Sequence, residues 1–291
     1  MVFVLFGWGS VVYNKQALLA AKSILAKSDS ARILVFASHP ELFVDEKIKV
    51  IPITKFDLTN WRGPLDYIHR PKIYILKKTL LNIDENEPIC YLDSDMYCYD
   101  MPKEFNVPID NILMFNYEGR ISDSFHPQLH NFLAANRELL DKNGHSDLFP
   151  NLQMYNTGLI HMPPSSWRMK ALEEVLDLTD FLCIHLPQQM TWLEQASFCH
   201  VLPKYSKINA VASGFEHYWG HNSEVGFLLE KMPLRKIEEI AESRHSFDEL
   251  LNEAKSIQKT ATNKLRLFLR RQKRSMLKRI RLLKAKYYIS T

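Results

Sequence analysis

The 291-residue chain is predicted to adopt an α/β fold built on a parallel sheet. Three apolar runs, 2–6, 33–37 and 48–53, have the length and composition of buried strands. Residues 14–27, which show helical spacing of good helix formers, separate the first two runs. This alternation of strand and helix predicts parallel pairing. Another apolar run, 89–92, ends directly before two aspartates, and ligands bind beyond such strand ends in open α/β sheets.

The later elements show the same two patterns, apolar runs for strands and helical spacing of apolar residues for helices. Pro71 opens a predicted helix over 71–82, since a proline is tolerated in the first turn of a helix. A polar loop is expected after Pro52, which ends the third strand. A short strand is predicted over 112–115, and residues 154–162 form an apolar run that contains Asn156, Thr157 and Gly158. Helices are predicted over 130–140, 166–181 and 188–200, from residue 234, and over 263–288.

The domain organisation follows from composition. The hydrophobic fraction of 46% is enough for a sizeable core, and there is no internal repeat and no Gly/Ser-rich linker. A domain boundary is expected near residues 255–262. It divides the chain into a main domain over 1–255, called the body below, and a basic helical tail over 256–291.

The charge is divided between body and tail. The net charge is +4, but residues 264–286 contain eleven Lys or Arg and no acidic residue. The rest of the chain has 26 basic and 33 acidic residues, so the body is mildly acidic. This asymmetry indicates that the tail binds an anionic surface.

An apolar stripe along the tail favours a membrane as that surface. Its members recur at intervals of three or four residues, with one polar interruption: Leu265, Leu269, Gln272, Met276, Ile280, Leu283 and Tyr287. An apolar stripe beside a basic face is typical of an interfacial helix on anionic lipid, so residues 264–288 are predicted to bind a membrane surface. Nucleic acid is not expected, because phosphate binding does not use the stripe. The alternative is a helix that docks on the acidic body.

Cysteine usage and the N-terminus bear on location. Cys90, Cys98, Cys183 and Cys199 form no CxxC pair and no metal-ligand spacing, which fits a reducing compartment. The first residues resemble a strand more than a signal peptide, and no segment approaches a membrane span. The sequence thus predicts a cytoplasmic protein, peripheral on the inner face of the cell membrane.

The two aspartates, Asp93 and Asp95, are the clearest candidate site. A carboxylate is costly to bury without a partner, so two at one strand end favour a bound cation. Oxygen ligands suit Mn²⁺ or Mg²⁺, which could also hold a diphosphate. The alternative is an acidic turn that binds no ion.

Three further motifs follow in order, and a fourth lies near the N-terminus. They are Tyr155-Asn156-Thr157-Gly158-Leu159-Ile160, then Glu194-Gln195-Ala196, then His217-Tyr218-Trp219-Gly220, with Gly7-Trp8-Gly9-Ser10 directly after the first strand. Gly7 and Ser10 lie where nucleotides bind in doubly wound folds, but the third glycine of the dinucleotide spacing is lacking. A structural turn is therefore expected first, and contact with a nucleotide second.

This series of motifs resembles that of nucleotide-sugar glycosyltransferases with the GT-A fold, a Rossmann-like fold, and most closely glycosyltransferase family 8. That family includes bacterial lipopolysaccharide galactosyl- and glucosyltransferases, and the resemblance covers roughly residues 1–225. It implies that Asp93, Asp95 and His217 bind Mn²⁺ or Mg²⁺, with Asp93 also reaching the ribose of a UDP-sugar. A neutral imidazole is the ligand form of histidine, so metal affinity should fall in acid.

The resemblance also implies roles for the sugar-side residues. Asn156 would bind sugar hydroxyls, Gly158 would allow close backbone approach, and Gln195 would lie beside the anomeric carbon. Glu194 stands where the family has aspartate, and it is the candidate base if the reaction inverts configuration. Retention, as in the family, needs no dedicated base. The family's Lys-Pro-Trp is absent after Gly220, so His221 is the candidate phosphate contact.

Each of these residues also has a structural interpretation. His217 could be a core histidine, Asn156 to Gly158 a plain turn or bulge, and Gln195 a solvated helix residue. Arg70 and Lys72 could contact phosphate, but a solvated helix start is expected for them.

The predicted function is metal-dependent transfer of a hexose from a UDP-sugar to a lipopolysaccharide, capsule or other cell-surface glycan acceptor. One alternative is a haloacid-dehalogenase-like phosphohydrolase with Asp93 as nucleophile. Such enzymes place Thr or Val where this chain has Tyr97. Another is a non-catalytic, membrane-associated sugar-binding module.

Overall fold

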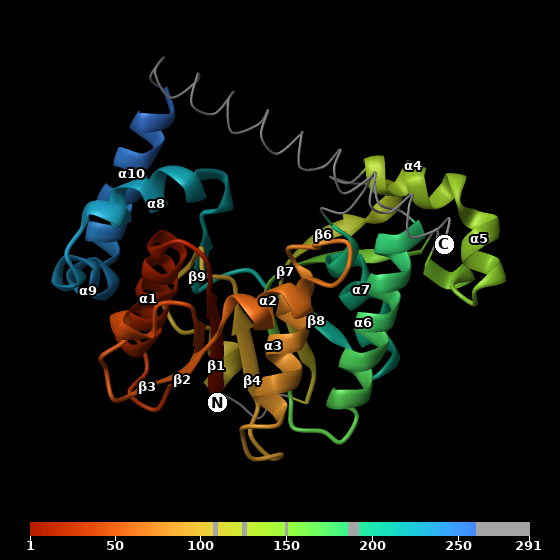
Figure 1. Cartoon of the computed structure of the whole chain (residues 1–291), viewed down its shortest axis with the longest axis horizontal. Coiled ribbons are helices and arrows are strands. Elements are labelled where there is room, and N and C mark those ends of the chain that lie inside the picture. Colours follow the sequence, from red (N-terminus) through yellow and green to blue (C-terminus); the bar gives the residue numbers. More distant parts are fainter. Residues whose placement is uncertain (107–109, 124–126, 149–150, 186–191, 260–291) are drawn as a thin grey trace. The chain divides into compact units, whose positions relative to one another are not determined.

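The computed structural model describes residues 1–106, 110–123, 127–148, 151–185 and 192–259 (Figure 1). Within these residues the chain is a mixed α/β structure whose main sheet has seven strands, most of them parallel. The described chain divides into two compact units. The first comprises 1–57, 87–106 and 213–259, and the second comprises the described parts of 58–86 and 110–212.

The first unit contains four parallel strands in the order β3-β2-β1-β4. They are β1 (Val2–Gly7), β2 (Arg32–Ala37), β3 (Ile48–Pro52) and β4 (Ile89–Leu92). Most of their side chains are buried, as expected for a parallel sheet covered on both faces. The predicted parallel sheet is confirmed, and β4 delivers its carboxyl end to the two aspartates.

Four helices of the first unit pack on one another: α1 (Val11–Leu25), α8 (Asn222–Lys231), α9 (Leu234–Glu242) and α10 (Arg244–Lys259). Helix α1 contacts α8 and α9, and α10 contacts the same two helices (Figure 1). The approach of α8 to α1 depends on Gly226, since a Cβ there would lie 2.6 Å from Cγ1 of Val12. A residue without a side chain therefore sets the spacing of the two helices.

A separate antiparallel pair in the first unit joins β5 (Met96–Cys98) to β9 (Phe215–His217). The pair packs on α10, where the ring of Phe247 stacks on that of Tyr97 in β5 with their centroids 3.8 Å apart. Neither strand was expected, because three residues are too short to show a period of two. This pair nevertheless determines where the chain after residue 214 lies.

The second unit contains three strands in the order β7-β6-β8, with β7 antiparallel and β8 parallel to β6. Its elements are α3 (Arg70–Leu80), β6 (Ile112–Arg120), α4 (Pro127–Ala135), α5 (Arg137–Lys142), β7 (Gln153–Met162), α6 (Arg168–His185), α7 (Leu193–Val201) and β8 (Ile208–Val211). Helix α6 contacts α3 and α7, and α7 contacts β7.

Several element boundaries differ from those expected. Strand β6 continues past Phe115 to Arg120, through register shifts that disguise its periodicity. The helix expected over 130–140 is two helices, α4 and α5, divided at Asn136. The polar segment after Pro52 contains a helix, α2 (Lys55–Arg62), because an amphipathic turn of this length can form once Trp61 is buried.

The predicted tail lies almost entirely outside the described residues. Helix α10 ends at Lys259, and residues 260–291, including the basic stripe over 264–288, are not described. Residues 186–191 are likewise outside the description; 188–191 of them belong to the helix expected over 188–200, and α7 begins at Leu193. Among the helices that are described, none has the length and hydropathy needed to span a bilayer. All four cysteines are buried and free.

Gly214 should be essential to the β5–β9 pair, which makes the first prediction. Its φ of +88° disfavours any L side chain, and a Cβ there would lie 2.7 Å from the carbonyl oxygen of Asp100. Its backbone N–H donates to Tyr99 Oη, and its carbonyl accepts from the N–H groups of Tyr99 and Asp100. Gly214→Ala should lower the free energy of unfolding by about 2–4 kcal/mol in urea titrations.

Gly9→Ala is the matched control for this prediction. Gly9 has a similar φ of +90°, but a Cβ there would meet nothing within 4 Å. Gly9→Ala should lower the free energy of unfolding by about 1 kcal/mol, which is the conformational penalty alone. Equal losses in the two variants would show that the close contact at Gly214 does not support the fold.

Candidate functional site

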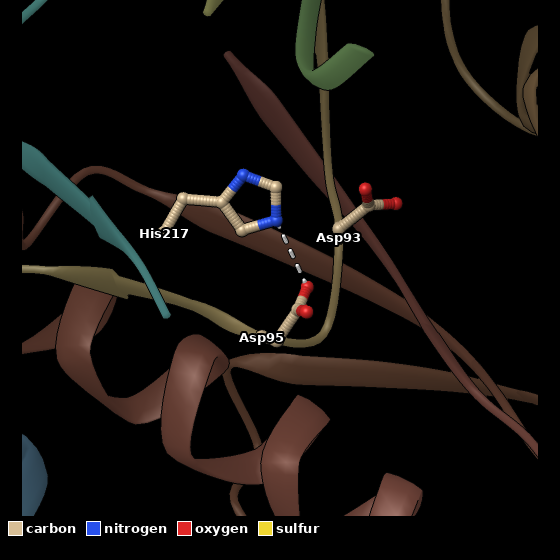
Figure 2. A group of neighbouring side chains, drawn as sticks. All are labelled: Asp93, Asp95 and His217. Carbon is tan, nitrogen blue, oxygen red and sulfur yellow. Dashed lines mark ion pairs between the residues drawn. The ribbon is translucent and has the colours of Figure 1, made fainter. Parts of the chain in front are cut away.

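The carboxyl end of β4 and the end of β9 bring together the three residues predicted to bind metal (Figure 2). Met96 pairs with His217 across the two strands, so the imidazole lies beside the Asp93–Asp95 turn. His217 Nε2 is 3.3 Å from Asp95 Oδ1, and ligand atoms of all three residues lie within 4.8 Å of one another. Backbone pairing of β5 with β9 thus brings together residues that lie more than a hundred positions apart in the sequence.

Each aspartate is held by a neutral donor. Tyr91 Oη donates to Asp93 Oδ1 at 2.9 Å, and Asn222 Nδ2 donates to Asp95 Oδ2 at 2.9 Å. The backbone N–H of Tyr218 also donates to the carbonyl of Asp95 at 3.1 Å. Burial, with a smaller effect from the Asp95 charge, raises the pKa of Tyr218 well above its usual value. The aspartate turn is therefore held in part by uncharged hydrogen-bond donors.

The geometry of this cluster fits a divalent cation. Octahedral Mg²⁺ or Mn²⁺ bonds of about 2.0–2.2 Å place adjacent ligands roughly 3 Å apart and opposite ligands about 4.3 Å apart. The 3.3 Å between His217 Nε2 and Asp95 Oδ1 is close to the first value, and no two of the three ligand atoms are more than 4.8 Å apart. Two carboxylates and an imidazole at these spacings could bind a cation with little rearrangement, while its remaining positions would be open to oxygen ligands.

A second cluster, in the other unit, centres on Glu118. Its Oε1 accepts from Asn156 Nδ2 at 3.0 Å, and its Oε2 accepts from Gln195 Nε2 at 2.7 Å. Because a carboxylate can only accept, each amide must direct its nitrogen to Glu118. No hydrogen bond to Gln195 Oε1 is found among the described residues, and a role for this oxygen in binding a ligand stays a prediction. Gln195 is 8% exposed, which excludes the solvated interpretation.

Asn156 and Gly158 lie in an irregular part of β7. The register jumps from Ile160 opposite Met114 to Asn156 opposite Phe115, which marks a β-bulge. Asn156 Oδ1 accepts the N–H of Gly158 at 2.8 Å and closes the bulge. The structural interpretation as a bulge is thus correct, but bulges also re-aim side chains beside functional sites.

Glu194, which directly precedes Gln195 in α7, belongs to a separate buried network. Its Oε1 is 2.8 Å from Lys72 Nζ and accepts from Thr157 Oγ1 at 2.9 Å. Lys72 Nζ also donates to the carbonyl of Thr157 at 3.1 Å, and the N–H of Glu194 donates to Tyr67 Oη at 3.1 Å. The Glu194 carboxylate is thereby committed to a buried ion pair, and a role as base stays a prediction.

The expectation of a solvated helix start at Arg70 and Lys72 is wrong. Both side chains are buried. Arg70 makes a two-pronged pair with Asp180, with both N–O distances at 2.6 Å, and Lys72 pairs with Glu194. A helix start usually faces water, but α3 packs against α6, so its first turn needs buried counter-charges.

Gly7, Ser10 and His221 lie in the first unit. Gly7 ends β1, and a Cβ there would lie 3.0 Å from Oδ1 of Asn14, so the glycine permits close packing of α1. Ser10 directly precedes α1 and its carbonyl accepts from Asn14 Nδ2. His221 lies between β9 and α8, and its buried Nδ1 has no hydrogen bond among the described residues. Their contact with a ligand stays a prediction.

Two residues of these clusters, Glu118 and Asn222, were missed by sequence reasoning, and a third, Lys72, was expected to be solvated. Glu118 lies past the expected end of its strand, in a stretch where bulges destroy the alternation. Lys72 and Asn222 act through partners more than a hundred residues away. A pattern within a short window of sequence contains no sign of such pairs.

Comparisons with solved structures identify the fold. A galactosyltransferase, LgtC, in complex with donor and acceptor sugar analogues is 13% identical with a TM-score of 0.54, covering 83% of this chain and 95% of that chain. The glycosyltransferase GlyE of Streptococcus pneumoniae TIGR4 is 11% identical with a TM-score of 0.46, covering 86% of this chain and 64% of that chain. Only the first likeness is close enough to carry an argument, and at that identity it shows the fold alone.

The fold is therefore the GT-A fold predicted from the sequence. No family model and no curated protein matches the chain. Membership of glycosyltransferase family 8 accordingly stays a prediction.

The buried Lys72–Glu194 pair yields a second prediction. Lys72→Met should lower the free energy of unfolding by about 3–5 kcal/mol, because it leaves a buried carboxylate without its counter-charge. Adding Glu194→Leu should restore part of the loss, since the uncompensated charge is then removed as well. Chemical denaturation at neutral pH measures all three proteins.

Lys77→Met provides the control. Lys77 lies in α3, as Lys72 does, and makes a partly exposed ion pair with Glu173 of α6. Such pairs contribute about 0–1 kcal/mol to stability. If Lys72→Met were no more damaging than Lys77→Met, the buried pair would not be a structural requirement.

Proposed function

We propose that this protein is a metal-dependent glycosyltransferase that moves a hexose from a UDP-sugar to a glycan or glycolipid acceptor. The observation that carries the proposal is the Asp93–Asp95–His217 cluster at a strand end of a GT-A fold. This cluster supplies ligands that suit Mn²⁺ or Mg²⁺ and could hold the diphosphate of the donor through the ion. The ion, when bound, would stabilise the negative charge that develops on the leaving nucleotide diphosphate.

The residues of the second unit suit the sugar half of such a donor. Asn156 and Gln195 present amides whose orientation is fixed by Glu118, and oriented amides are suited to sugar hydroxyls. With its nitrogen on Glu118, Gln195 would direct Oε1 toward the anomeric carbon. A neutral amide oxygen next to that carbon is compatible with the retaining outcome predicted from the sequence.

Further parts of the proposal rest on the sequence. Asp93 would also reach the ribose, His221 would contact phosphate, and Gly7 and Ser10 would lie near the nucleotide. The acceptor would be a lipopolysaccharide, capsule or related cell-surface glycan. Residues 264–288 would hold the enzyme on the inner face of the membrane, where such acceptors are assembled.

A ligand screen tests the function directly. UDP-sugars with Mn²⁺ should raise the melting temperature of the wild-type protein more than either ligand alone, since ligands that bind the native state stabilise it. The stabilising UDP-sugar should also be hydrolysed slowly or transferred, with release of UDP. Asp95→Ala should abolish the joint effect and the reaction, because it removes a ligand of the ion.

Asp29→Ala is the matched control, since it removes the same charge from a fully exposed side chain of the same unit. Its ligand response should equal that of the wild type. Failure of every UDP-sugar to bind or react, or full activity in Asp95→Ala, would refute the proposed function.

Glu118 gives a prediction about the chemical step. Glu118→Gln replaces one accepting oxygen by a donor, so it can no longer hold both Asn156 and Gln195. The kcat should fall about a hundred-fold with a smaller change in KM, because misplacement of a reacting group mainly affects the transition state.

Gln195→Ala should have a similar effect, and the double variant should be little worse than either single one, since both changes remove the same oriented amide. Glu173→Gln, at an exposed site of the same unit, should leave kcat unchanged. Fully additive losses would show that Glu118 does not act through Gln195.

A further inference from the structure

Asn222, the first residue of α8, joins the metal cluster to helix α1. Its Nδ2 donates to Asp95 Oδ2 at 2.9 Å, and its Oδ1 accepts from Gln16 Nε2 at 2.7 Å. Gln16 Nε2 also donates to the backbone carbonyl of Asn222 at 3.1 Å. The three side chains form a chain of hydrogen bonds that begins inside α1 and ends on a carboxylate of the cluster.

The direction of each bond in this chain is determined by chemistry. Asp95 can only accept, so Asn222 must direct its nitrogen toward it, and Asn222 Oδ1 then requires a donor. Gln16 supplies that donor although it is fully buried and its own Oε1 has no partner among the described residues. A buried amide with an unmade hydrogen bond is costly, so an apolar side chain at position 16 would suit the core better. The hydrogen bond that Gln16 donates to Asn222 Oδ1 accounts for an amide at this buried position.

Helix α8 is also held to α1 at its other end. Lys15 Nζ donates to the carbonyls of Leu229, Glu230 and Met232 at 3.0, 2.9 and 2.6 Å, which are unsatisfied groups at the helix C-terminus. Between the two ends, Gly226 brings α8 against Val12. The backbone of Asn222 is thus fixed, and its amide has one direction available.

We propose that Asn222, backed by Gln16, is a positioning residue for the metal site: it holds Oδ2 of Asp95 so that Oδ1, which faces His217 Nε2, is directed at the cation. The inference rests on the proposed function, because it presumes that the cluster binds a divalent ion. Without Asn222 the Asp95 carboxylate would be free to turn, and the binding geometry would have to be formed at the expense of its rotational freedom. Loss of such an outer partner typically weakens metal binding 10–100-fold.

The test is Mn²⁺ affinity, measured by the loss of the electron paramagnetic resonance signal of free Mn²⁺ without any sugar substrate. Four full-length proteins are compared: wild type, Asn222→Leu, Gln16→Leu and Lys15→Met. Asn222→Leu keeps the size of the side chain and removes its donor. Lys15→Met loosens α8 at its far end and leaves the Gln16–Asn222–Asp95 chain intact, so it reports a purely structural effect. Melting temperatures in EDTA measure the stability of each protein.

The expected result is at least a 10-fold weaker Mn²⁺ affinity in Asn222→Leu, a smaller loss in Gln16→Leu, and an affinity within about 3-fold of wild type in Lys15→Met. A wild-type affinity in Asn222→Leu would overturn the inference and leave the proposed function intact. So would a loss in Lys15→Met as large as that in Asn222→Leu, because affinity would then follow stability alone. If the wild-type protein bound no Mn²⁺, the metal site would be refuted together with the inference.

Discussion

The antiparallel pairing of β5 with β9 is the interaction on which the metal cluster depends. It places His217 opposite Met96, one residue past Asp95, and so converts two aspartates at a strand end into a three-ligand site. Backbone hydrogen bonds fix this register, and Gly214 permits the close turn that leads into it. A shift of one residue would turn the imidazole to the opposite face of the pair. The chemistry of the site is therefore a consequence of the register of two three-residue strands.

In both candidate clusters the side chains are oriented by hydrogen bonds to neighbouring groups. In the first unit, neutral donors hold the two aspartates, while in the second Glu118 holds two amides. The Lys72–Glu194 ion pair, in the same unit as Glu118, compensates a buried charge. Holding side chains in this way lowers the entropy that ligand binding must remove, which is the physical basis of preorganisation.

The elements with strong periodicity and the residues at strand ends could be predicted from the sequence. The parallel pairing of β1, β2 and β3 and the strand that ends at Asp93 follow from local patterns. The partnership of His217 with the aspartates follows from the resemblance of the motif series to glycosyltransferase family 8. What could not be predicted depends on tertiary pairing. Bulges in β6 and β7 conceal Glu118, and the burial of Lys72 requires a partner from another helix. Because that partner is distant in the sequence, the helix start at Lys72 was predicted to be exposed to solvent.

Direct detection of the imidazole at the metal tests the account most sharply. Electron spin echo envelope modulation of bound Mn²⁺ reports a nitrogen atom in its coordination shell, and uniform ¹⁵N labelling changes the modulation frequency. The account predicts the signal of one coordinated histidine nitrogen in the wild-type protein and its loss in His217→Gln. Bound Mn²⁺ without nitrogen modulation, or the same modulation in His217→Gln, would contradict the claim that β9 completes the metal site.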